Sequence, residues 1–209
     1  NYNIRKNISP NINLYIEPIC GDEGNSIGSC QLYVENLNSQ SYENIYLNGI
    51  EPDYNFKLND MEILKKVSEK DIVDLLLSKN IVALFQGKSE SGPRALGNRS
   101  LLFDPRIVNG KDIVNAVKKR ENYRPFAASI MLEHVHEWFD MASLKESPYM
   151  MFAVQALKGV RDKIPSVIHV DNSCRIQTVS KNNKILYKLL DEFNKKTNVP
   201  ILFNTSFNL

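Results

Sequence analysis

Basic side chains and glycines are interleaved between residues 87 and 100, a stretch whose composition suits the binding of an anion. Three cations, Lys88, Arg94 and Arg99, stand there among three glycines and one proline. This combination is typical of a turn that brings backbone N–H groups and guanidinium groups close to phosphate or carboxylate oxygens. We therefore predict an anion-binding loop. The alternative is a solvated loop whose cations form only surface ion pairs.

The first two glycines of this stretch, Gly87 and Gly92, have the spacing found in a P-loop. A P-loop needs Lys-Ser/Thr directly after the second glycine, where this sequence has Pro93-Arg94. Because that lysine and the magnesium-binding hydroxyl are missing, Walker-type phosphate binding is a poor fit.

The loop stands between two apolar runs that predict strands. Residues 81–85 form a continuous apolar run, as expected of a strand covered on both faces, and residues 100–103 form a second one. Open α/β sheets bind ligands beyond the ends of such strands. The loop therefore lies where a ligand site is expected.

Apolar runs and helical periodicities alternate along the chain and predict an α/β fold. After the loop, strands are expected at 127–132, 150–154, 166–169, 175–179 and 200–203, and helices at 111–119 and 183–195. Before it, we expect a strand at 12–16, a helix at 26–37, at most a short strand at 44–47, and two short helices at 61–77, with a capping-box-like sequence from Ser68 to Asp71. A polar, asparagine-rich connection at 38–58 predicts a domain boundary.

Charge and composition limit the classes of function. The net charge is only +2, yet residues 87–124 hold nine basic and four acidic side chains. A local basic patch in a near-neutral protein favours a small anionic ligand over a nucleic acid. No stretch approaches the roughly 20 apolar residues of a membrane span, and no signal segment opens the chain. A cytoplasmic protein without a membrane partner is expected.

Cysteines and histidines give no pattern of a metal site. Cys20, Cys30 and Cys174 are widely spaced, which fits free buried thiols better than a disulfide framework or a Cys-x-x-Cys site. His134 and His136 form a pair without a third ligand at a recognisable spacing, so surface or packing histidines are expected.

Two further arginines stand where an anionic partner is expected. Pro125 restricts Arg124 to extended backbone geometry, which holds this side chain on a stiff turn. Arg175 opens a predicted strand beside an apolar run, and a cation in that setting needs an anionic partner.

Seven sequence blocks resemble, in their order along the chain, the C-terminal region of the O-carbamoyltransferases of the NodU and cephalosporin/tobramycin carbamoylation type. The blocks are Gly87-Lys-x-Glu-x-Gly-Pro-Arg-Ala-Leu-Gly-Asn-Arg-Ser100, Asp104-Pro-Arg106, Lys118-x-Arg-Glu-x-x-Arg-Pro-Phe126, Ser147-Pro-Tyr-Met150, His169-Val-Asp171, Arg175-x-Gln-Thr-Val179 and Asn204-Thr-Ser-Phe-Asn208. Residues 18–28 are similar to the closing strand, turn and helix of the family's N-terminal domain, which has an actin-like ATPase fold.

The resemblance implies a fold and a domain organisation. Residues 61–209 would form a YrdC-like domain, a twisted open mixed sheet with flanking helices, truncated at its C-terminus because the family pattern continues past Asn208. Residues 1–40 would be the C-terminal remnant of the actin-like domain, and residues 41–60 the linker.

The resemblance also implies an activity. In this family the YrdC-like domain binds ATP, with Mg²⁺, and carbamoyl phosphate, and makes carbamoyl adenylate. The N-terminal domain, which holds iron or a similar metal, then carbamoylates a hydroxyl of a small-molecule acceptor. Two alternatives would keep the fold without this chemistry, namely a non-catalytic nucleotide-binding module and an RNA-binding module.

Site residues follow from the matched motif positions. Lys88, Arg94 and Arg120 are implied to be catalytic, and Asp22 matches a metal-binding aspartate of the N-terminal domain. Lys88 stands where arginine is frequent in the family, and lysine cannot grip phosphate with the same two parallel hydrogen bonds. The positions implied to bind substrate or nucleotide are Arg99, Ser100, Arg124, Arg175, Thr178, Asn204, Ser206 and Asn208.

Overall fold

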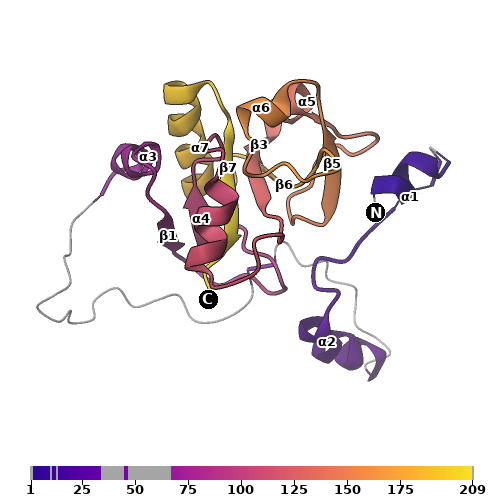
Figure 1. The fold of residues 1–209 in the computed structure, drawn as a ribbon. Helices are drawn as coiled ribbons and strands as arrows, with labels where there is room; N and C mark the ends of the chain where they lie inside the picture. The colour runs from indigo at the N-terminus through magenta and orange to yellow at the C-terminus, as the bar shows by residue number, and fades with distance from the viewer. Residues whose placement is uncertain (1, 10, 13, 34–44, 47–66, 209) are drawn as a thin grey trace, which may run out of the picture.

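A computed structural model of the chain describes residues 2–9, 11–12, 14–33, 45–46 and 67–208. Within these residues, seven strands form one sheet in the order β1-β2-β7-β3-β6-β5-β4 (Figure 1). β3 and β6 pair in parallel, and the other neighbours are antiparallel. The expected mixed α/β architecture is confirmed, whereas the YrdC-like and actin-like assignments stay predictions. The strands are β1 (Val82–Phe85), β2 (Arg99–Phe103), β3 (Ala127–Met131), β4 (Phe139–Asp140), β5 (Phe152–Ala156), β6 (Ser173–Val179) and β7 (Ile201–Ser206).

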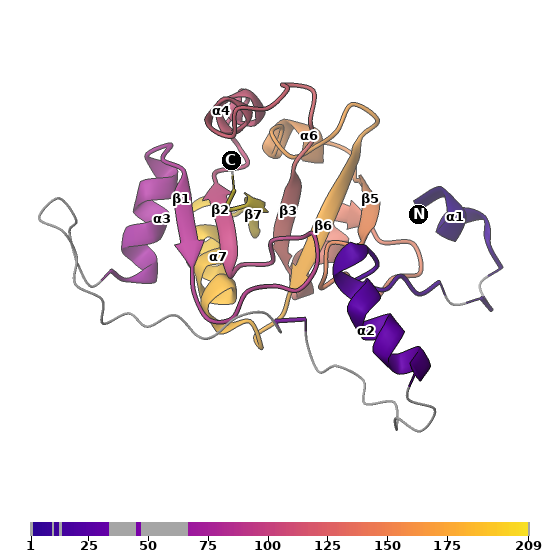
Figure 2. The ribbon, with the colours of Figure 1, turned by 90° about the horizontal axis from the view of Figure 1, so that it is seen from below.

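Helices cover both faces of the sheet. Figure 2 shows α4 and α6 on one face and α7 on the other, and α3 packs against α7. The central strand β3 is consequently buried along its whole length. The helical elements are α1 (Tyr2–Asn7), α2 (Asp22–Tyr33), α3 (Glu69–Leu77), α4 (Gly110–Val117), the 3-10 turn η1 (Leu132–His134), α5 (Val135–Trp138), α6 (Val160–Lys163) and α7 (Lys184–Thr197).

The start of α3 confirms the capping box predicted from Ser68 to Asp71. The Ser68 hydroxyl accepts from the Asp71 N–H at 3.3 Å, and the Asp71 carboxylate accepts from the Ser68 N–H at 2.8 Å. Two of the N–H groups that begin a helix without a partner are thereby satisfied. The helix that begins there buries Val73 and Leu76 and packs against α7.

Phenylalanine rings fill the core between the sheet and α4. The ring centroid of Phe203 lies 4.5 Å from that of Phe126 and 6.1 Å from that of Phe103. All three rings are buried, as is Val114 of α4. This packing anchors the end of β7 and the start of β3, where the candidate site lies.

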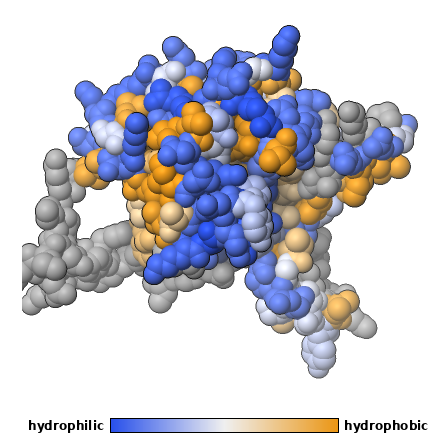
Figure 3. Space-filling view, in the orientation of Figure 1, coloured by the Kyte–Doolittle hydropathy of each residue, from blue (hydrophilic) through white to orange (hydrophobic). Residues whose placement is uncertain are grey.

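The surface seen in Figure 3 has hydrophilic residues gathered over α4, with apolar side chains between them. Val108, just before α4, and Val117, at its last position, are exposed apolar side chains. None of the helices in the described residues has the length and apolar character to cross a membrane.

Two predicted strands do not form. Residues 166 and 167 lie in a turn and residues 168 and 169 in irregular backbone, because Ser166 donates from both its N–H and its hydroxyl to the carbonyl of Pro105, and the His169 N–H donates to the carbonyl of Ser173. Residues 12 and 14–16, the described part of the strand expected at 12–16, also lie outside any strand.

Other differences concern element boundaries. The helix expected at 26–37 begins earlier, at Asp22, where a carboxylate in the first turn complements the helix dipole. Ile45 and Tyr46 are in neither helix nor strand, and the rest of the segment expected at 44–47 lies outside the described residues, as do residues 61–66. The short elements η1, α5, β4 and α6 were not predicted, because two to four residues carry too little periodicity.

Upstream residues pack against the connection between β1 and β2. Ile19 and Ile45 are buried with Leu96 in an apolar cluster separate from the main core. The Ser91 N–H donates to the carbonyl of Ile45 at 2.7 Å. The domain limits stay predictions, but these contacts show that upstream residues help to fix the connection.

Gly97 provides a test of this packing. Its φ is +110°, and a Cβ at this position would lie 2.9 Å from Cδ2 of Leu186. We expect Gly97→Ala to lower the free energy of unfolding by about 1–3 kcal/mol through backbone strain, with steric overlap in addition. Denaturant unfolding measures this change.

The control is Gly28→Ala. Gly28 lies in α2 with no atom within 4 Å of the added Cβ, so this change should be neutral or stabilising. Equal stability of Gly97→Ala and the unchanged chain would contradict the described conformation.

Candidate anion-binding site

The basic loop, residues 86–98, connects β1 to β2 and is tied back on itself by Arg99. The Arg99 guanidinium donates to the carbonyl oxygens of Gln86 at 2.6 Å, Asn98 at 2.8 Å and Gly87 at 2.9 Å. Arg99 thus joins both ends of the loop.

The start of β2 holds the loop in two further ways. The Arg99 guanidinium carbon lies 3.7 Å from the centroid of the Phe85 ring, a cation–π contact across the β1–β2 pair. The hydroxyl of the buried Ser100 accepts from the Gly97 N–H at 2.9 Å. Arg99 and Ser100, both expected to bind the ligand, are therefore placed as loop-closing residues.

A buried carboxylate organises the second half of the basic loop. Oε1 of Glu90 accepts from the backbone N–H groups of Leu96 at 2.6 Å, Asn98 at 2.9 Å and Arg99 at 3.4 Å. The sequence predicted that such N–H groups would meet an external anion. In the structure an internal carboxylate occupies them.

A small cavity of about 110 Å³, here called the arginine pocket, opens between the basic loop and the ends of β3, β6 and β7. Three predicted arginines, Arg94, Arg120 and Arg175, contribute to its wall. Its lining comprises Pro93, Arg94, Ala95, Arg120, Pro125, Phe126, Met150, Arg175, Asn204, Thr205 and Ser206.

Polar atoms in the arginine pocket lack partners. Nε of Arg94 and Nε of Arg175 are buried and have no hydrogen-bond partner in the part of the chain that the structure describes. The same holds for Oδ1 of Asn204. Buried groups of this kind cost free energy unless something pairs with them, so the wall is suited to a ligand that accepts from arginine.

The electrostatics of the pocket point to an anion. The pKa of Arg175 is lowered to about 10, first by burial and then by the nearby charges of Arg94 and Arg120. Burial also lowers the pKa of Arg120, with Arg124 as the next cause. Because no acidic residue lines the pocket in the described part of the chain, an anion would offset both the burial and the mutual repulsion of these cations.

Arg120 is held in place by neutral partners. Its Nε donates to Oδ1 of Asn115 at 2.6 Å, and its guanidinium carbon lies 4.1 Å from the centroid of the Phe126 ring. Asn115 is fully buried and donates in turn to the carbonyls of Asn122 and Arg124. Arg120 is thus oriented without losing its charge to a carboxylate.

Asn204 forms the floor of the pocket through a network of neutral side chains. Its Nδ2 donates to the Ser129 hydroxyl at 2.9 Å and to Oε1 of Gln177 and the Ala95 carbonyl, both at 3.3 Å. The Ser129 hydroxyl also donates to Oε1 of Gln177 at 2.7 Å. These bonds fix the orientation of the Asn204 amide, so its unpaired Oδ1 is an acceptor held in a fixed position.

The chain after β7 is bound by a buried lysine. Nζ of Lys118 donates to the carbonyl of Ser206 at 2.7 Å, and to the carbonyl and Oδ1 of Asn208 at 2.5 and 2.9 Å. The Ser206 hydroxyl donates to Oδ1 of Asn208 at 2.6 Å. Ser206 therefore reaches the arginine pocket, while Asn208 faces Lys118 from outside the pocket wall.

The remaining predicted site residues lie elsewhere. Lys88 is exposed on the basic loop, and Arg124 is half-exposed and paired with Glu121 at 2.7 Å. The Thr178 hydroxyl accepts from the Ser147 N–H at 2.8 Å and lines a second cavity.

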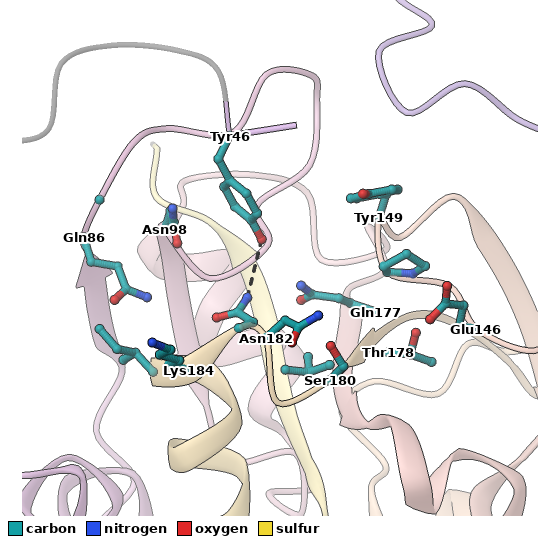
Figure 4. A pocket seen from close by; sticks show the side chains of 15 residues that line it. Tyr46, Gln86, Asn98, Glu146, Tyr149, Gln177, Thr178, Ser180, Asn182 and Lys184 are labelled. Atoms are coloured by element: carbon teal, nitrogen blue, oxygen red, sulfur yellow. Dashed lines mark hydrogen bonds between the residues drawn. The ribbon is translucent and has the colours of Figure 1, made fainter. Parts of the chain in front are cut away.

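This second cavity, the amide pocket, measures about 670 Å³ and lies beyond the ends of β1 and β6, at the start of α7 (Figure 4). Its one basic side chain, Lys184, is matched by one acidic side chain, Glu146. Side-chain amides dominate the rest of its polar wall, with the rings of Tyr46 and Tyr149 at one end (Figure 4). The amides are those of Gln86, Asn98, Gln177, Asn182 and Asn183.

Metal-ligating side chains do not gather in the described residues. No group of three or more His, Cys, Asp or Glu could hold a metal ion there. Asp22 is exposed at the first position of α2, so its metal-binding role stays a prediction. His134 contacts the Glu137 carboxylate at 3.1 Å, an ordinary surface contact.

All three cysteines are free, but only one is buried. Cys174 lies within β6, where burial raises the pKa of its thiol to about 12. Cys20 and Cys30 are exposed, so the prediction of buried thiols was wrong for these two.

Sequence reasoning missed three supporting residues, Glu90, Asn115 and Lys118. Each is polar or charged and almost fully buried, a state that demands partners. Glu90 and Lys118 stand inside the motif blocks, close to the arginines. Their position was the sequence signal that could have identified them as supporting residues. Asn115 lies on the inward side of a predicted helix and offered a weaker one.

Comparison with known proteins gives the following likenesses. Residues 73–209 match the family described as Carbamoyltransferase C-terminus. The chain is 50% identical over 131 residues to nodulation protein NolNO of Sinorhizobium fredii, covering 61% of this chain and 19% of that protein. It is 44% identical over 138 residues to nodulation protein NolO of Bradyrhizobium diazoefficiens, covering 65% and 25%. It is 33% identical over 202 residues to nodulation protein U of Azorhizobium caulinodans, covering 93% and 35%.

Arg94 provides the test of the arginine pocket. Arg94→Ala removes a guanidinium group whose Nε has no partner among the described residues, so it should weaken pyrophosphate binding by about tenfold or more. The melting temperature should stay the same or rise, because repulsion with Arg175 is relieved. Isothermal titration and scanning calorimetry measure the two effects.

The matched control is Lys70→Ala, which removes an exposed cation on α3. This change should alter neither the affinity for pyrophosphate nor the melting temperature. A large loss of melting temperature in Arg94→Ala would instead assign Arg94 a structural role.

Proposed function

This chain belongs to the Carbamoyltransferase C-terminus family, and from that premise we propose that it activates a carbamoyl group as carbamoyl adenylate. The substrates would be ATP, with Mg²⁺, and carbamoyl phosphate, and the activated group would pass to a hydroxyl of a small-molecule acceptor. The observation that carries the proposal is the arginine pocket, where three guanidinium groups meet without an acidic neighbour in the lining. The family resemblance predicted from the seven motif blocks is confirmed.

The reaction needs two successive substitutions at phosphorus, each of which forms one P–O bond and breaks another. Carbamoyl phosphate and water would give carbamate and phosphate by cleavage of the bond between phosphorus and the carbamoyl oxygen. A carbamate oxygen would then attack the α-phosphorus of ATP. The bond from that phosphorus to the bridging oxygen would break, and pyrophosphate would leave with the electron pair.

Electrostatics and positioning supply most of the catalysis in such phosphoryl chemistry. Arg94 and Arg175 would donate to the anionic oxygens, since their buried Nε atoms lack partners within the described chain. Arg120, oriented by Asn115, would donate to the same anionic group from a third direction. Arginine suits this role because it stays protonated even where burial lowers its pKa, as for Arg175.

The residues present fit an anionic substrate better than a bare metal ion. The described residues that line the arginine pocket include no carboxylate, so Mg²⁺ would be held by the phosphates of the nucleotide and would serve to screen their charge. The chain's own contribution is then to bind the phosphate oxygens that the ion leaves open.

The two cavities suggest that the phosphates and the nucleoside of the nucleotide bind in different pockets. The arginine pocket, at about 110 Å³, has room for only a few waters at ≈ 30 Å³ each, and thus for a group of phosphate size. The amide pocket, at about 670 Å³, is within the range of roughly 300–1,000 Å³ common for ligand pockets. Its balanced charge and its amides suit the uncharged nucleoside.

The transfer step would need further parts of a longer protein. The chain spans only 19 to 35% of the length of the relatives described above. An actin-like N-terminal domain, with iron or a similar metal near Asp22, would hold the acceptor. The part described here would supply the activated carbamoyl group.

The proposed activity is tested by pyrophosphate release. The full-length parent protein, incubated with ATP, Mg²⁺ and carbamoyl phosphate, should release pyrophosphate only when carbamoyl phosphate is present. Arg94→Ala should reduce the rate by about 10-fold or more, because an interaction with developing charge is lost. Nucleotide binding without turnover in the folded parent would favour a non-catalytic nucleotide-binding module.

The division between the two cavities is tested with Asn182→Ala. Asn182 is exposed in the amide pocket, so its loss should weaken ATP binding by about fivefold, the effect of one hydrogen bond of roughly 1 kcal/mol. Binding of carbamoyl phosphate should be unchanged in titration calorimetry. Asn109→Ala is the control, since Asn109 is exposed before α4, on the other face of the sheet.

Equal effects of Asn182→Ala on both ligands would contradict this division. So would an effect of Asn109→Ala as large as that of Asn182→Ala.

A further inference from the structure

Glu90 is a buried acidic residue in the middle of a loop that carries cations. Only 9% of its surface is exposed, and it is not among the residues that line the arginine pocket. Its Oε1 accepts from three backbone N–H groups, those of Leu96, Asn98 and Arg99. Charge-assisted bonds of this kind are stronger than neutral ones, so this contact strongly fixes the backbone.

The bond from Glu90 to Leu96 closes a ring of the chain that contains Arg94. At 2.6 Å it is the shortest of the three bonds, and it joins residues only six positions apart. The Nε of Arg94 has no partner among the described residues, so no bond from this atom orients the side chain. The direction of Arg94 therefore depends on the backbone that Glu90 holds.

The other side of the same backbone is also fixed. The Leu96 carbonyl accepts from Nε2 of Gln177 at 3.0 Å and from Nδ2 of Asn183 and the Tyr46 hydroxyl at 3.3 Å. Glu90 binds the N–H of Leu96 while these groups bind its carbonyl. Removing Glu90 would release one side only, so the loop would stay attached but lose its orientation.

We propose that Glu90 is a positioning residue, whose carboxylate occupies the backbone N–H groups of the basic loop and thereby aims Arg94 into the arginine pocket. This inference rests on the proposed function, in which Arg94 binds a phosphate-bearing substrate. It assigns the N–H groups of Leu96, Asn98 and Arg99 to an internal anion, which leaves ligand recognition to the arginines.

The test measures binding of inorganic pyrophosphate to the 209-residue chain by titration calorimetry, well below the melting temperature. Glu90→Ala should weaken binding by about tenfold or more, as expected when Arg94 is no longer directed into the arginine pocket. Glu90→Gln should stay within roughly threefold of the unchanged chain, because an amide oxygen can still accept from the same N–H groups. Rescue by glutamine distinguishes positioning from a need for negative charge.

Asp104→Asn is the matched control. Asp104 is another buried carboxylate, 3% exposed, which accepts from the N–H and the guanidinium of Arg106 after the far end of β2. Its replacement should lower the melting temperature while the folded protein keeps its affinity for pyrophosphate. If Glu90→Ala does not fold, Glu90→Asp replaces it and should show the same loss, because the shorter side chain cannot reach all three N–H groups.

Three results would overturn the inference. Unchanged affinity in folded Glu90→Ala, or in its replacement Glu90→Asp, would show that Arg94 is aimed by other contacts, and the proposed function would stand. An equal loss in Asp104→Asn would reveal a general effect of destabilisation. Absence of pyrophosphate binding in the unchanged chain would overturn the proposed function as well.

Discussion

The mutual repulsion of Arg94, Arg120 and Arg175 is the constraint on which the rest of the structure depends. Desolvation and like charges both act against burying guanidinium groups together, and the lowered pKa of Arg175 reflects these two causes in that order. Among the residues that the structure describes, no acidic one lines the cavity to relieve them. The fold must therefore hold the cations in place through contacts that leave their charge available.

Neutral groups and backbone atoms meet this requirement. Asn115 and the Phe126 ring hold Arg120, and the start of β2 closes the basic loop through Arg99. The one acidic residue of the loop, Glu90, directs Oε1 to backbone N–H groups. These charged side chains thus bind main-chain groups, which leaves the positive charge of the pocket uncompensated.

The sequence predicted the elements that carry strong local patterns. The strand at 81–85, the capping box at Ser68 and the amphipathic helix near 183–195 all appear, since each depends on residues close in the chain. The prediction that the strand is covered on both faces was wrong, because β1 is an edge strand of the sheet and exposes Ala83 and Phe85. The segment 166–169 was predicted as a strand because Val167 and Ile168 are apolar and buried, but a distant partner fixes its backbone, since Ser166 donates to the carbonyl of Pro105. Likewise, motif positions identified the arginines, but only tertiary contacts separate Arg99, which closes the loop, from Arg94, which faces the cavity.

The neutral floor beneath the arginines shows why such a site costs stability. Ser129, Gln177 and Asn204 form a closed hydrogen-bond network, yet Oδ1 of Asn204 is left without a partner among the described residues. A carboxylate at position 204 would pair with the arginines and stabilise the free protein, but it would also repel an anionic ligand. An amide keeps an acceptor in place without that charge. Under the proposed function, the unsatisfied atoms of the pocket would pair with the bound anion, so the free protein would give up stability for binding at this position.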